Sequence, residues 1–220
     1  MDDTSNLQIE QLLAPMLKRV RGIPFSVVVK ALSGRQVLRV DKEAPADREL
    51  LNRLASAVQL CPAELRVSPI TRSRPNEVGN DLEAYVMRAC SKSGLMAERP
   101  TGLSGHGKST GYADILVRDH ENRPTHLECK IFTSGTAGTT MRSFYLSPSE
   151  SFKVSVDARH LLLAFEMEAA PVPGSQESRY TPKAFKVVDL HDLPCDVKYE
   201  FNSDNRKLYQ PSLLLMEGHA

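Results

Sequence analysis

The sequence predicts an α/β fold built on a central mixed sheet. Two short strand-like runs, residues 112–117 and 125–132, alternate and are rich in β-branched and aliphatic residues, and they flank a charged turn that contains Asn and Pro, which is typical of a β-hairpin. A continuous apolar run at residues 160–167 predicts a buried strand. Apolar residues at helical spacing in residues 77–92 predict a helix ahead of the hairpin. Helices and strands therefore share one core.

Length and composition allow one domain with additions, or two small ones. The chain has 220 residues, of which 41% are hydrophobic and 25% charged, and its formal net charge is +1. This balance neither favours nor excludes DNA binding, because a local basic groove is sufficient. The four cysteines are scattered and indicate a reduced, cytoplasmic protein. We expect no signal peptide and no membrane span.

The first third predicts a helix, a hairpin and a second helix. The helix covers residues 7–21, with Pro15 interrupting it, and the hairpin joins residues 25–31 and 36–40 around Gly34. A second helix is expected at residues 44–60, and a Pro- and Arg-rich boundary at 61–76. We expect an N-terminal α+β subdomain at residues 1–65, serving packing, DNA contacts or dimerisation, and a core at residues 66–220.

The predicted hairpin brings two carboxylates together. With its turn centred near Glu121, Asp114 lies opposite Glu128, and Lys130 points to the same side. Two carboxylates this close repel each other unless they share a proton or bind a divalent cation. Mg²⁺ suits such a pair, because it is held by carboxylates and water. A neighbouring lysine can then orient a water or stabilise charge on a phosphate.

Asp114, thirteen intervening residues and Glu128-Cys129-Lys130 resemble the signature of the PD-(D/E)xK nuclease superfamily, which includes restriction endonucleases and Holliday-junction resolvases. The order of the helix, Arg99-Pro100 and a Gly/Ser-rich segment is similar to that of archaeal resolvases. Ala113 stands where the motif's name has proline. Over residues 76–167 the resemblance implies a restriction-endonuclease-like α/β/α core of order αβββαβ, here with C-terminal strands added.

The resemblance also implies roles for individual residues. Asp114, Glu128 and a helix carboxylate, Glu83 or in its place Glu77, would bind metal together with the backbone carbonyl of Cys129. Lys130 would assist the attacking water. The expected metal is Mg²⁺, with Mn²⁺ able to substitute. The expected activity is that of a type II restriction-like endonuclease that cuts DNA, leaves 5′-phosphate ends and acts as a homodimer.

Four basic residues are expected to contact DNA: Lys108, Arg142, Lys153 and Arg99. His126 is either functional or a surface histidine at the end of a strand. Downstream we expect a helix at residues 149–157, a loop at 169–182, a strand at 184–190 and a hairpin joining 198–201 to 207–209.

Three alternatives remain at this point. A junction or repair nuclease would use the same chemistry, and a nucleic-acid-binding module would keep the fold without cleaving. Residues 102–109, GLSGHGKS, also satisfy the P-loop pattern of an NTPase. A P-loop needs a buried strand before it and a helix directly after it, and the flanking sequence predicts neither.

Overall fold

The computed structural model describes residues 3–16, 20–102, 111–136, 138–139, 144, 146, 152–197, 205–208, 210–213 and 216. The chain divides into two compact units, residues 23–194 and residues 1–22 with 195–220. The larger unit contains the sheet and both sides of the predicted hairpin. The expected division into a subdomain at residues 1–65 and a core at residues 66–220 stays a prediction.

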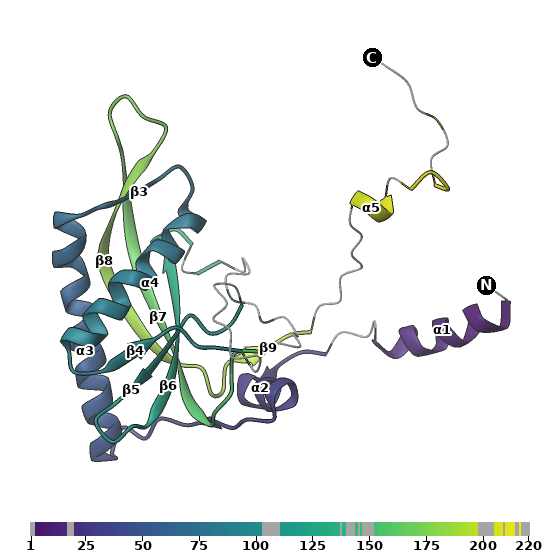
Figure 1. Ribbon diagram of the computed structural model, residues 1–220, viewed down its shortest axis with the longest axis horizontal. Helices are drawn as coiled ribbons and strands as arrows, with labels where there is room; N and C mark the ends of the chain where they lie inside the picture. Colours follow the sequence, from purple (N-terminus) through teal and green to yellow (C-terminus); the bar gives the residue numbers. More distant parts are fainter. Residues whose placement is uncertain are drawn as a thin grey trace. The chain divides into compact units, whose positions relative to one another are not determined.

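A mixed sheet forms the centre of the larger unit, with strand order β3-β8-β7-β6-β5-β4 (Figure 1). Its strands are β3 (Ile70–Arg72), β4 (Met96–Glu98), β5 (Ile115–Arg118), β6 (Pro124–Phe132), β7 (Ala158–Pro171) and β8 (Ser178–Asp189). β6 and β7 run parallel, whereas β5 pairs with β6, and β8 with β7, in antiparallel orientation. The predicted α/β class with a central mixed sheet is confirmed.

Two helices, α3 (Pro45–Val67) and α4 (Pro75–Lys92), cover one face of this sheet (Figure 1). Leu54 of α3 and Leu82 of α4 share one buried cluster with Leu127 of β6 and Leu163 of β7. The odd-numbered residues of β6 from Leu127 to Ile131 pack into or against this core, so the even-numbered Glu128 and Lys130 point away from it.

The predicted hairpin at residues 25–40 is wrong. Phe25–Ser33 form helix α2, and Gly34 ends it in the left-handed conformation, with φ of 71°. Phe25 and Val29, one helical turn apart, are both buried, while Val27 is 54% exposed. This spacing fits a helix, and packing overrides the β-preference of the valine run. The short strand β2 (Val37–Leu38) pairs parallel to the start of β7.

Three other expectations need correction. Residues 61–67, expected in a linker, continue α3 through Pro62, because Cys61 and Leu65 pack into the core. Residues 152–157, expected in a helix, have no helical structure. The loop expected at residues 169–182 is mostly strand, since β7 and β8 extend to within six residues of each other. The expected order αβββαβ calls for a strand between the helix and the hairpin, and β4 stands there; its residues were not located from the sequence, and it pairs with β5.

Short elements complete the chain. In the sequence, β1 (Ile23–Pro24) begins the larger unit, and β9 (Pro194–Cys195), which pairs with β1, includes the last residue of that unit. In the smaller unit, α1 (Asp3–Met16) includes Pro15 and ends before the expected residue 21, and α5 (Asn205–Leu208) is helical where a strand was expected. Residues 198–204 of that expected hairpin lie outside the described residues. No helix in the described part of the chain is long and apolar enough to cross a membrane.

Candidate active site

Asp114 and Glu128 face each other at the start of the β5–β6 hairpin. Ile115 pairs with Leu127 and Leu116 with His126, so the preceding residue, Asp114, lies opposite Glu128. The Asp114 amide donates to the Leu127 carbonyl at 3.2 Å, and the Cys129 amide donates to Asp114 Oδ2 at 2.8 Å. The predicted register is confirmed: one bond fixes the Asp114 backbone and the other holds its carboxylate.

Glu128 is a buried carboxylate, and one of its oxygens has no hydrogen-bond partner among the described residues. Its side chain is 7% exposed, and Oε1 lies 2.6 Å from the Lys130 ammonium. Within the described residues Oε2 has no hydrogen-bond partner. Burial, and then the negative charge of Asp114, raise the pKa of Glu128 to about 7. A cation bound at this oxygen would offset both the burial of the carboxylate charge and its repulsion by Asp114.

Glu83 projects from α4 and is 7% exposed, whereas Glu77 in the first turn of that helix is exposed. Burial, and then the charge of Asp114, raise the pKa of Glu83. Arg99 opposes this shift, with Nη1 3.4 Å from Glu83 Oε2. Glu83 therefore interacts with the carboxylate pair through its charge, and its burial favours it over Glu77 as the helix carboxylate.

The arrangement fits a hard divalent cation held by few side chains. No three His, Cys, Asp or Glu side chains in the described ranges converge closely enough to hold a metal ion. Two carboxylates remain, Asp114 and Glu128, which lie opposite each other across the hairpin, and within the described residues Glu128 Oε2 has no hydrogen-bond partner. Mg²⁺ is commonly bound by one or two carboxylates, waters and substrate phosphates, so this pair is sufficient. The Cys129 carbonyl, a backbone group, is the further ligand that the resemblance to the nuclease superfamily implies.

Two lysines accompany the carboxylates in different ways. Lys130 pairs with Glu128; burial lowers the pKa of this ammonium, but the charge and hydrogen bond of Glu128 together with the charge of Asp114 outweigh burial, so the pKa is raised. Lys153, expected to line a DNA groove, is only 3% exposed. Its Nζ donates to the carbonyls of Gly111 at 2.8 Å and Ala113 at 3.1 Å. Lys153 thus lies behind Asp114 and not on an open surface.

Beneath Asp114 lies a buried aromatic cluster that the sequence did not indicate. The Tyr112 hydroxyl and His160 Nδ1 are 2.7 Å apart, and the His160 ring lies 4.8 Å from that of His126. His126 is fully buried, so the expectation of a surface histidine is wrong: β6 lies between β5 and β7, away from the sheet edge. Burial lowers the pKa of His126 to about 4, which keeps its ring neutral near pH 7.

Of the four predicted DNA contacts, two can be located. The Arg99 side chain is 46% exposed while it bridges to Glu83, so it stands where the site opens to solvent. Lys153 is buried, as described above. Lys108 and Arg142 lie outside the described residues, as does the P-loop-like segment apart from Gly102.

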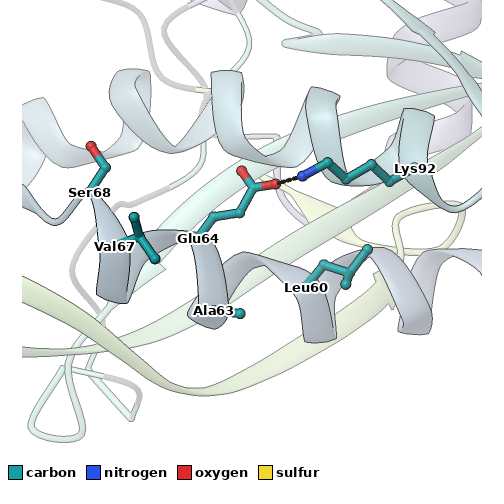
Figure 2. A pocket seen from close by; sticks show the side chains of 6 residues that line it. All are labelled: Leu60, Ala63, Glu64, Val67, Ser68 and Lys92. Atoms are coloured by element: carbon teal, nitrogen blue, oxygen red, sulfur yellow. Dashed lines mark hydrogen bonds and ion pairs between the residues drawn. The ribbon is translucent and has the colours of Figure 1, made fainter.

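A separate hollow lies on α3 and α4, lined by Leu60, Ala63, Glu64, Val67, Ser68 and Lys92. Figure 2 shows that Glu64 and Lys92 pair across it. None of the predicted site residues borders this hollow. Its charged groups are paired with each other, so it offers no chemistry that competes with the carboxylate pair.

The sequence of this chain is similar to that of known type II restriction enzymes. The model of the type II restriction enzyme MjaV family matches residues 17–212. The type II restriction enzyme MjaV of Methanocaldococcus jannaschii is 34% identical over 233 aligned residues, covering 99% of this chain and 98% of that protein. No solved structure matches the chain.

Proposed function

This chain belongs to the type II restriction enzyme MjaV family and is a DNA endonuclease, and we propose that Asp114, Glu128 and Lys130 form its catalytic site. Type II restriction enzymes generally need a divalent metal, and we propose Mg²⁺ for this one. The observation that carries the assignment is the buried Glu128 oxygen without a partner among the described residues, in a carboxyl whose pKa is raised by burial and then by the charge of Asp114. Structural carboxylates in a core are normally satisfied.

Each residue has a distinct part in phosphodiester hydrolysis. Asp114 and Glu128 would hold the cation, together with the Cys129 carbonyl. When bound, such a cation lowers the pKa of a coordinated water and neutralises charge on the phosphate. Lys130, anchored 2.6 Å from Glu128, holds its ammonium where it can orient the attacking water and stabilise the developing negative charge. Glu83 adds negative charge beside the pair, and Arg99 bridges to it and extends toward solvent.

Family membership also bears on the alternatives. It favours a restriction endonuclease over a junction nuclease, a non-cleaving binding module and a P-loop NTPase. Exposed Arg99 supports a phosphate contact beside the site, and Lys108 and Arg142 remain proposed DNA contacts from the sequence. We further propose that two copies act as a homodimer, so that two sites cut two strands of a palindromic target.

Digestion of plasmid DNA tests these assignments. Discrete fragments should appear with Mg²⁺ or Mn²⁺ and disappear with EDTA. Asp114→Asn, Glu128→Gln and Lys130→Met should each lower the cleavage rate by at least about 100-fold, which is the scale for losing one group that stabilises transition-state charge. DNA binding in EDTA should survive in all three variants.

Matched surface variants serve as controls. Glu98→Gln and Lys92→Met replace side chains that are 63% and 60% exposed, and both should cut at the wild-type rate. Cleavage that survives Asp114→Asn but is lost with Lys108→Ala would instead favour the P-loop hypothesis. Sedimentation with and without DNA measures whether the active species is a dimer.

A further inference from the structure

We propose that Lys153 is a positioning residue of the endonuclease site, whose buried ammonium fixes the backbone that presents Asp114 to Glu128. This inference rests on the proposed function, since it concerns the same carboxylate pair. Lys153 enters from the segment before β7, 39 positions after Asp114 in the sequence. It is a different cation from Lys130, which pairs with Glu128 directly.

The contacts converge on one peptide group. Lys153 Nζ donates to the Ala113 carbonyl at 3.1 Å, and the N–H of the same peptide, that of Asp114, donates to the Leu127 carbonyl at 3.2 Å. A second bond from Nζ, of 2.8 Å, holds the Gly111 carbonyl. With its carbonyl and its N–H both held, the Ala113–Asp114 peptide cannot rotate freely. The direction of the Asp114 side chain is set by this constraint.

Lys153 is itself held firmly. Its neighbours Phe152 and Val154 are 4% and 1% exposed, so the segment is anchored in the interior on both sides of the lysine. The Phe152 ring stacks near that of Tyr112, with centroids 6.5 Å apart, and the Tyr112 hydroxyl bonds to His160. Residues 111–114 are thus braced by a lysine at the backbone and by an aromatic stack at a side chain.

Charge accounts for an ammonium in this interior position. Burial lowers the pKa of Lys153 overall, and the charges of Asp114, Glu83 and Glu128 oppose this shift. The carboxylates therefore help to keep the lysine ionised, and the lysine moderates their mutual repulsion. With 3% exposure and two carbonyl partners, Lys153 is poorly placed to reach a DNA phosphate, in contrast to the 46% exposed Arg99.

Lys153→Met tests the proposal because it removes charge and donors while keeping an unbranched chain. Mn²⁺ affinity without DNA, measured by calorimetry, should fall about 10- to 100-fold, which is usual when a group that orients a metal ligand is lost. Hydrogen exchange at the Asp114 amide should accelerate by at least about tenfold. DNA affinity in EDTA should stay within about twofold, and single-turnover cleavage should slow. Lys153→Arg, which keeps charge and donors, should recover part of the metal affinity.

Three results would overturn the proposal. Tighter Mn²⁺ binding by Lys153→Met would mean that the lysine acts only as a repelling charge. Weaker DNA binding with unchanged Mn²⁺ affinity would make it a DNA contact. Unchanged affinity and unchanged exchange would leave it no role at the site. Lys153→Gln replaces the Met variant if that variant fails to fold, and Lys92→Met controls for loss of a surface lysine.

The proposed function fails on different evidence. If Asp114→Asn still cleaves DNA, the catalytic assignment is wrong. The exchange rate of the Asp114 amide in Lys153→Met still reports whether Lys153 fixes this backbone.

Discussion

Replacing Glu128 by Gln should stabilise the metal-free protein, and more so at high pH. Folding raises the pKa of this carboxyl from 4.5 to about 7, so the folded state holds its proton more tightly. Glu128 therefore contributes full stability below pH 4.5 and loses it as the pH rises through 7. By this linkage, the free energy of unfolding of Glu128→Gln relative to wild type should increase by about 2.5 kcal/mol between pH 5 and pH 8.

Urea denaturation in EDTA measures this difference. The chain has no tryptophan, so far-UV circular dichroism is the appropriate signal. Saturating Mn²⁺ should stabilise wild type and shrink its deficit against the variant, because a bound cation relieves the repulsion that the folded state carries. Glu98→Gln, at an exposed position, serves as the matched control and should show no such pH dependence.

A constant difference between Glu128→Gln and wild type across pH 5 to 8 would refute this reasoning. It would mean that the Glu128 carboxyl meets no greater opposition to ionising in the folded protein than in the unfolded chain. A cation at the unpaired Glu128 oxygen would then gain nothing from relieving charge repulsion in the folded protein.

Three further predictions concern stability and use the same urea assay in EDTA. The free energy of unfolding of wild type should fall by about 2 kcal/mol between pH 7.5 and 5, because the pKa of the buried His126 ring is lowered to about 4 from an unfolded value of 6.5 and the folded state opposes its protonation. His126→Leu should remove this fall; an equal fall in both proteins would contradict the prediction. Asp47→Asn should cost about 3–5 kcal/mol, since it removes a buried carboxylate that pairs with the partly buried Arg159, 2.5 Å away, and with Arg123; a cost below 1 kcal/mol would show that these pairs are not needed. Gly94→Ala should cost about 1–2 kcal/mol, because φ is 80° and the new Cβ would lie 2.1 Å from Arg53 Nη1; an unchanged midpoint would show that the site adapts.

The central part of the site could be predicted from the sequence because its geometry is local. Once the turn is placed near Glu121, the two-residue repeat of a strand decides that Asp114 faces Glu128 and that Lys130 follows on the same side. No longer-range information is needed. The helix α4 was similarly accessible, since its apolar residues recur at helical spacing and a glycine follows its end.

Where tertiary packing decided the structure, the sequence was misleading. The run around Val27 to Val29 favours a strand by its residue types, yet it is helical because Phe25 and Val29 bury together. A proline inside a helix costs about 3 kcal/mol, so Pro62 predicts that the helix ends there. Helix α3 nevertheless continues, because Cys61 and Leu65 pack into the core. Lys153 was misplaced for the same reason, since only the fold brings it behind Asp114.

The residues of the site are separated by different distances along the sequence. Asp114, Glu128 and Lys130 lie within the 17 residues from 114 to 130, and one hairpin brings them together. Closing so short a loop costs little chain entropy, and hairpins form within microseconds. Glu83 and Lys153 can join only after α4 and the segment before β7 have docked. The proposed catalytic pair can thus be inherited as one local unit, independently of the longer-range packing that brings in Glu83 and Lys153.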